Sequence, residues 1–77
     1  MDLTETEKHV LQRLVKKGSM GNVMEFLNWP QSEFEKGFEF ANTLQNKDLV
    51  KLLYSNFNKN QIVVELTLVG FEHGQIK

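Results

Sequence analysis

The side chains best able to perform acid–base or metal chemistry in this sequence are two histidines and ten acidic residues. Their spacing argues against a catalytic or metal centre. His9 and His73 lie far apart, and the sequence contains no cysteine and no His-x-x-x-His pair. Zinc sites need several such ligands at close spacing, so we expect no metal and no cofactor. No carboxylate pair lies beside a histidine, a serine or a glycine-rich loop as acid–base or phosphate chemistry requires. We therefore expect that the chain is not an enzyme.

The composition indicates one small globular domain. The chain has 77 residues, of which 40% are hydrophobic and 25% are charged, and its formal net charge is −1. No apolar run approaches the roughly 20 residues that span a bilayer, and the start of the chain lacks the apolar region of a signal peptide. Together with the absence of cysteine, this leads us to expect a cytoplasmic protein outside the membrane. Met1 and the length also suggest a complete small protein.

Two helices are predicted in the first part of the chain. The first, at about residues 5–17, opens with the capping-box pattern Thr4-Glu5-Thr6-Glu7. The second, at about residues 20–28, is expected to begin after Ser19 as its cap. It should end at Asn28-Trp29-Pro30, because the residue before a proline resists helical dihedral angles. A minor strand between these two helices also fits the pattern.

A third helix is predicted at about residues 31–47. It opens with a second capping-box pattern, Ser32-Glu33-Phe34-Glu35. Its inward stripe follows helical spacing, with Phe34, Phe38, Ala41 and Leu44. Gly37 lowers helix propensity by about 1 kcal/mol relative to alanine. We expect this glycine to permit a close approach to the first or second helix.

A β-hairpin is predicted to follow, with strands at about residues 49–54 and 62–68. The intervening residues 55–60 are rich in asparagine and read as a turn. The second strand alternates, so that Val64, Leu66 and Leu68 share the buried face. The expected fold class is therefore α+β, with a three-helix core followed by a β-hairpin in a single domain over residues 1–77.

Three short motifs resemble the winged helix-turn-helix family, in particular MarR-like transcription-regulator domains. Residues 44–50 read Leu-Gln-Asn-Lys-Asp-Leu-Val and match the usual end of the third helix, with Asp48 in place of glycine. Aspartate tolerates a left-handed backbone better than most residues. Residues 66–70 match the usual exit from the wing, and residues 3–7 match a common start of the first helix. The resemblance implies a winged helix over most of the chain.

The resemblance also implies a non-enzymatic module that binds double-stranded DNA or regulates transcription. In such domains the third helix enters the major groove, and the hairpin, or wing, touches the backbone or the minor groove. The matching positions on the third helix and on the wing are Gln31, Ser32, Lys36, Asn42, Thr43, Asn58 and Lys59.

An alternative is a winged helix that binds a basic protein partner. Glu33, Glu35 and Glu39 lie on the third helix, where a phosphate-lined groove would repel them. Trp29 and Phe57 are candidate anchors. For Trp29 we favour a lid over the core, whereas Phe57 is expected either to fold back under the wing or to form a contact point. A homodimer is a further alternative, although it would need a surface other than terminal helices, which we do not expect here.

A second resemblance points to RNA. The hairpin, its Leu-Thr-x-x-Gly exit at residues 66–70 and the following Gly74 are similar to the N-terminal winged-helix modules of phenylalanyl-tRNA synthetase α subunits. This resemblance implies an RNA-binding accessory domain as another alternative function.

Overall fold

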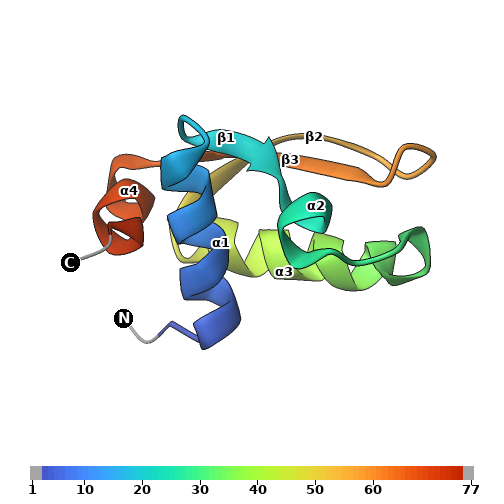
Figure 1. The fold of residues 1–77 in the computed structure, drawn as a ribbon, viewed down its shortest axis with the longest axis horizontal. Helices are drawn as coiled ribbons and strands as arrows, with labels where there is room; N and C mark the ends of the chain where they lie inside the picture. Colours follow the sequence, from blue (N-terminus) through green and yellow to red (C-terminus); the bar gives the residue numbers. More distant parts are fainter. Residues whose placement is uncertain (1–2, 76–77) are drawn as a thin grey trace.

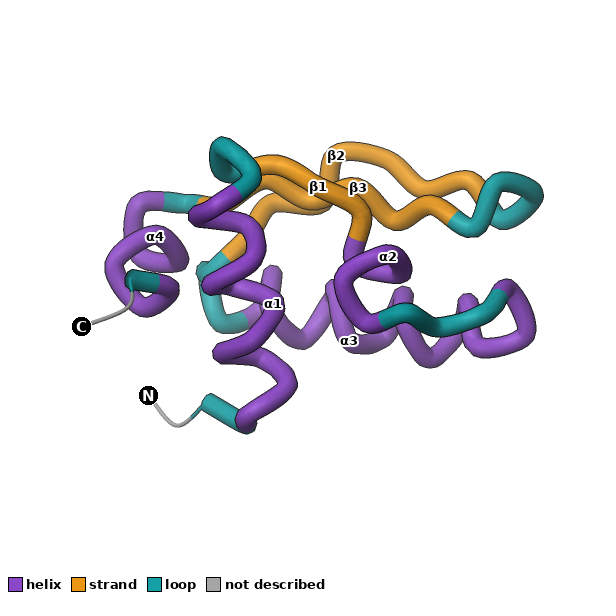
Figure 2. The backbone as a smooth tube through the Cα atoms, in the orientation of Figure 1, coloured by secondary structure: helices purple, strands orange, loops and turns teal. Residues whose placement is uncertain are grey.

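The chain places its first three helices on one side of a three-stranded antiparallel sheet, as Figures 1 and 2 show. The computed structural model describes residues 3–75, so the expected domain of residues 1–77 extends beyond the described part at both ends. The elements are α1 (Glu5–Lys16), β1 (Met20–Asn22), α2 (Val23–Leu27), the 3-10 helix η1 (Gln31–Glu33), α3 (Phe34–Asn46), β2 (Val50–Asn56), β3 (Gln61–Leu66) and α4 (Leu68–Gly74). The α+β class is confirmed, and the layout is winged-helix-like.

The sheet has the order β1-β3-β2, so β3 is central and β2 is an edge strand. β2 and β3 form the expected hairpin, with Lys51 opposite Glu65 and Asn56 opposite Gln61. A bulge interrupts the register of β2 between Leu52 and Tyr54. The minor strand that was expected between the first two helices is β1, which pairs with β3.

The first helix begins as the sequence predicts. The Thr4 backbone amide donates to Glu7 Oε1 at 2.8 Å, and the Glu7 backbone amide donates to Thr4 Oγ1 at 3.1 Å. These two bonds form the capping box. α1 ends at Lys16, within one residue of the prediction, and Gly18 follows with a left-handed φ of 83°.

The predicted start of the second helix is wrong. Ser19 does not cap a helix, because its φ of 78° continues the left-handed turn begun at Gly18 and sends the chain into β1. Asn22 is the cap instead. Its Oδ1 accepts from the backbone amide of Met24 at 3.1 Å and from that of Ile62, on β3, at 2.9 Å. The helix therefore begins where β1 leaves the sheet.

The predicted capping box of the third helix is also wrong. Pro30 has an extended ψ of 168° and opens the 3-10 helix η1, whose first bond runs from the Glu33 amide to the Pro30 carbonyl. Ser32 therefore lies inside η1, and α3 starts two residues later, at Phe34, without a side-chain cap. The expectation for Gly37 is confirmed: a Cβ at this position would collide with Met24 Sδ of α2.

The end of the chain differs most from the prediction. β3 stops at Leu66, and Thr67 Oγ1 accepts from the Gly70 amide at 3.0 Å, which caps an unexpected fourth helix, α4. Leu68, expected on the buried face of a strand, is instead 74% exposed. α4 packs against α1, where a Cβ on Gly74 would press on the Leu11 carbonyl.

The core fills the space between the helices and the inner face of the sheet. Its buried apolar side chains are Val10, Leu11, Leu14, Val23, Met24, Phe26, Ala41, Leu44, Leu49, Val50, Ile62 and Val64. Of the stripe predicted on the third helix, Ala41 and Leu44 belong to this core. Phe34 and Phe38 are only half-buried at its edge. The first half of α3 thus presents aromatic rings at the surface.

Candidate functional site

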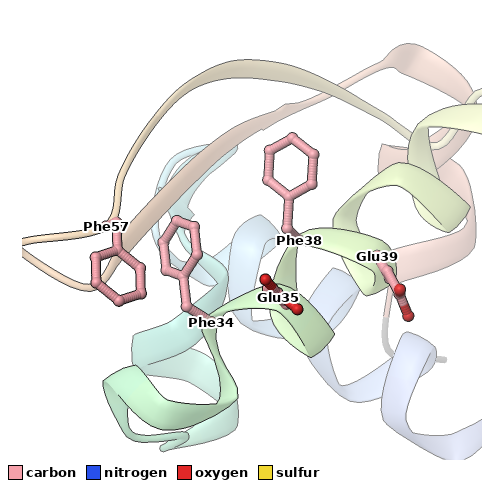
Figure 3. A pocket seen from close by; sticks show the side chains of 5 residues that line it. All are labelled: Phe34, Glu35, Phe38, Glu39 and Phe57. Atoms are coloured by element: carbon pink, nitrogen blue, oxygen red, sulfur yellow. The ribbon is translucent and has the colours of Figure 1, made fainter.

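A groove runs between the first half of α3 and the tip of the β2–β3 hairpin (Figure 3). It is open to solvent, has a volume of about 480 Å³, and is lined by Phe34, Glu35, Phe38, Glu39 and Phe57. Phe34 and Phe38 point from α3 toward the hairpin, and Phe57 comes from the hairpin itself. We call this site the α3–hairpin groove.

The helical repeat explains the arrangement on α3. Phe34 and Phe38 are four residues apart, as are Glu35 and Glu39, and residues at this spacing lie on one face of a helix. Each pair therefore forms a stripe along the axis with a repeat of about 6 Å. The acidic stripe lies beside the aromatic stripe, because neighbouring residues differ by about 100° around the axis.

The hairpin tip is tied to the start of α3. Gln31 Nε2 donates to the Phe57 carbonyl at 2.6 Å, and the rings of Phe34 and Phe57 meet edge to face with centroids 5.3 Å apart. Asn60 Nδ2 donates to the Trp29 carbonyl at 2.9 Å. Phe57 thus folds back toward α3 and still leaves 55% of its surface exposed. The ring contact agrees with the expectation that Phe57 folds back, and its role as a contact point for a partner stays a prediction.

Three of the residues that the resemblance assigned to DNA lie along α3. Lys36 and Thr43 are seven residues apart and share one side of the helix, where Lys36 Nζ lies 5.1 Å from the Trp29 ring centroid. Asn42 is half-buried and shares its side with Glu35, also seven residues away. Thr43 Oγ1 donates to the Glu39 carbonyl at 3.0 Å. Asn42 therefore lies about 100° around the helix from Thr43, the same separation as between the aromatic and acidic stripes.

The other residues assigned to DNA lie in the hairpin turn and in η1, which are in contact with each other. Asn58 and Lys59 are exposed in the turn of the hairpin, and Gln31 and Ser32 are exposed in η1. The side-chain amide of Gln31 already donates a hydrogen bond to the Phe57 carbonyl. Within the hairpin turn of residues 57–60, the cation is Lys59.

The acidic residues assigned to a protein partner are better placed. Glu33, Glu35 and Glu39 are all exposed, and the last two line the groove. Trp29 is half-buried, packs against the core and meets the Phe40 ring edge-on, which agrees with its interpretation as a lid. Trp29 also lines a second, smaller hollow of about 370 Å³, together with His9 and Phe26.

The buried ionisable group of the described chain is Glu7, which is 3% exposed. Both its carboxylate oxygens accept from Lys47 Nζ at 2.9 Å. Burial raises the pKa of the Glu7 carboxyl, but the Thr4 amide and the Lys47 ammonium together outweigh it, so the pKa falls below the ordinary value. Lys47, at the C-terminal end of α3, is therefore engaged with α1. This pair joins α1 to the C-terminal end of α3.

Residues 3–75 contain no cluster of three or more histidine, aspartate or glutamate side chains that would hold a metal ion. His9 and His73 are both exposed. None of the helices described is both long enough and apolar enough to cross a membrane.

Sequence reasoning missed the groove because it assigned Phe34 and Phe38 to the core. Their helical spacing is the same whether they are buried or line a surface hollow. The available signal was Phe57, a large apolar residue in a turn, which pointed to an apolar contact near the hairpin tip.

Comparison with known protein families, with curated proteins and with solved structures finds no match to this chain. The likeness to a winged helix therefore rests on the motifs and on the layout of helices and hairpin, and membership of that family stays a prediction.

Proposed function

We propose that this domain is a non-enzymatic protein-binding module that captures a basic and apolar segment of a partner in the α3–hairpin groove. The observation that carries the proposal is the meeting of three aromatic rings with two exposed carboxylates at one open hollow. The groove thus offers apolar and negatively charged groups to the same partner.

The aromatic side of the groove supplies a driving force for association. Phe57 is 55% exposed, and Phe34 and Phe38 are half-buried. Fully burying a phenylalanine side chain is worth about 1.5–3 kcal/mol, and contiguous exposed apolar surface commonly marks an interaction site. Binding of a partner that covers these rings is therefore favoured, because the rings are removed from water.

The acidic side supplies selectivity. Within residues 3–75, neither Glu35 nor Glu39 forms a salt bridge. Both carboxylates are thus available to lysine or arginine side chains at the rim of the groove, where complementary charge raises the association rate and disfavours acidic partners.

DNA binding, implied by the family resemblance, is the competing function. The winged-helix-like layout favours it, and Asn58 and Lys59 are exposed at the hairpin tip. Glu35 and Glu39 oppose it, because the face of α3 beside the hairpin would bring two carboxylates toward phosphates. The balance of charge at the groove therefore supports a protein partner over a duplex.

A random peptide library displayed on phage tests the proposal. Selection on the intact protein should enrich sequences that combine lysine or arginine with large apolar residues. The double variant Glu35→Lys/Glu39→Lys should lose these peptides. The matched control Glu25→Lys/Glu72→Lys, which changes net charge equally on exposed positions of α2 and α4, should retain them.

A parallel titration with a short random-sequence DNA duplex at low salt separates the two functions. If amide NMR signals of α3 and the hairpin shift with duplex and the library yields no peptide, the domain binds DNA and the proposal is wrong.

A further inference from the structure

We propose that the captured segment is an amphipathic α-helix lying along α3, with apolar side chains against the phenylalanines and lysine or arginine side chains against Glu35 and Glu39. This inference rests on the proposed function of the groove and specifies the form of its ligand. Figure 3 shows the five side chains that such a helix would contact.

The first argument comes from the two stripes on α3. The aromatic stripe and the acidic stripe run side by side, so the ligand must present an apolar stripe and a basic stripe to the same surface. Successive residues of a β-strand point to opposite faces. If apolar and basic residues alternate along a strand, only one of the two sets can face the groove. A helix carries both on neighbouring sides, for example apolar residues at i and i+4 with basic residues at i+1 and i+5.

The second argument comes from the edge of the sheet. An unpaired edge strand such as β2 is the usual place for a ligand to add as an extra strand. Here the Leu52 amide already donates to Gln45 Oε1 at 2.8 Å, and the Phe57 carbonyl already accepts from Gln31 Nε2 at 2.6 Å. Two glutamines, one on α3 and one on η1, thus occupy backbone groups on β2 and just beyond it.

The bulge in β2 adds to this protection. It breaks the register between Leu52 and Tyr54, and bulges are among the devices by which proteins block pairing at sheet edges. A ligand strand would have to displace Gln45 and follow an irregular edge. A helix resting on the side chains of the groove needs neither change.

A second copy of this chain does not supply the ligand helix. Exposed cations do lie on α1, but the apolar face of α1 is buried in the core. The exposed apolar pair on α4, Leu68 and Phe71, lies next to Glu72. An acidic neighbour would face the acidic stripe of the groove, so the charges favour a basic helix from another protein.

Two synthetic peptides of identical composition test the inference on the whole chain. Both contain leucine, lysine and alanine. The first places leucines at i and i+4 and lysines at i+1 and i+5, and the second alternates leucine with lysine in the two-residue period of a strand. Fluorescence anisotropy gives the affinities, and isotope-edited NMR gives the conformation of each bound peptide.

The helical pattern should bind at least about tenfold more tightly, become helical on binding, and shift amide signals of α3 and the hairpin tip. Phe57→Ser should weaken it by about tenfold. This side chain is largely exposed, so the variant should keep the fold and its amide spectrum outside the groove. Glu35→Gln/Glu39→Gln should weaken binding and reduce its salt dependence, whereas Glu25→Gln/Glu72→Gln should not.

The outcomes separate this inference from the proposed function. If the alternating peptide binds equally well, or binds in an extended form at the groove, the helical ligand is refuted and the protein-binding function stands. If binding of the helical peptide is unaffected by Phe57→Ser, the groove is not its site and the inference also fails. If neither peptide binds and the phage library yields none, the proposed function itself fails.

Discussion

Charged residues at the two ends of α3 have different surroundings. At its C-terminal end, Lys47 meets the buried carboxylate of Glu7, which also accepts from the Thr4 amide. At its N-terminal end, Glu35 and Glu39 are exposed and have no salt bridge in the described chain. The comparison shows which charges hold helices together and which remain exposed at the surface.

The apolar residues of α3 follow the same division. Ala41 and Leu44 are fully buried against the core, whereas Phe34 and Phe38 are covered on one side only. At the hairpin tip, Phe57 contacts the Phe34 ring of α3 and accepts a hydrogen bond from Gln31 of η1. The hairpin does not close over this half of the helix. One helix thus serves as part of the core at one end and as one wall of a groove at the other.

The largest expected effect comes from removing the buried carboxylate. Glu7→Ala should lower the free energy of unfolding by about 2–4 kcal/mol, because it breaks the capping box and removes the ion pair between Glu7 and Lys47. Glu35→Ala should change it by no more than about 0.5 kcal/mol, as is usual at exposed positions. Urea denaturation followed by circular dichroism measures both. Equal losses in the two variants would contradict the division between the two ends of α3.

A smaller effect should appear on acidification. The pKa of Glu7 is lowered in the folded state, so its contribution to stability is complete above the ordinary glutamate pKa of 4.5 and is lost as pH falls through the lower folded value. The urea midpoint of the wild type should therefore fall toward that of Glu7→Gln below pH 4.5. Midpoints measured at intervals between neutral and strongly acidic pH test this, and parallel curves for the two proteins would disprove it.

A local effect is expected at the hairpin contact. Gln31→Ala removes the hydrogen bond to the Phe57 carbonyl, which is worth about 0.5–1.5 kcal/mol. Because the bond is exposed, we expect the lower part of that range, together with faster amide hydrogen exchange at the hairpin tip. Ser32→Ala, in the same 3-10 helix, is the control. Unchanged exchange in Gln31→Ala would show that Phe57 is held in place by its ring contact alone.

The smallest effect is a gain in stability. Glu35 and Glu39 are a like-charge pair four residues apart, an arrangement that destabilises a helix by about 0.2–0.5 kcal/mol. Glu39→Gln should therefore raise the free energy of unfolding by that amount, and the gain should shrink at high salt. Thermal denaturation at low and high ionic strength detects it. A loss of stability would mean that the Glu39 carboxylate supports the fold, contrary to its role as a free rim charge.

Local patterns along the chain were read correctly from the sequence. The Thr4–Glu7 capping box forms, Asp48 adopts the left-handed conformation expected of it, and Gly37 lies where α3 touches α2. The first two depend on residues within a few positions of one another, so short-range hydrogen bonding and backbone preference decide them. The close packing of α2 against α3 at Gly37 likewise follows from the absence of a side chain at that position.

The errors arose where distant residues compete for the same groups. Asn22 caps α2 while its Oδ1 also accepts from Ile62, forty positions later, and this pairing draws residues 20–22 into the sheet. Thr67 ends β3 because its hydroxyl caps α4 and reaches the Asp48 carbonyl. Ile62 and Asp48 are distant in the sequence, so helical and alternating patterns were extended too far, although the Thr67–Gly70 cap itself spans only three residues.

By itself, the sequence determined the α+β class, the order of three helices and a hairpin, and the acidic character of the third helix, because periodicity and residue type carry that information. Only the tertiary structure decided that Phe34 and Phe38 line a groove, since this depends on how closely the hairpin packs over α3. The same is true of Glu7 and Lys47, whose charges neutralise each other only because the fold brings α1 to the end of α3.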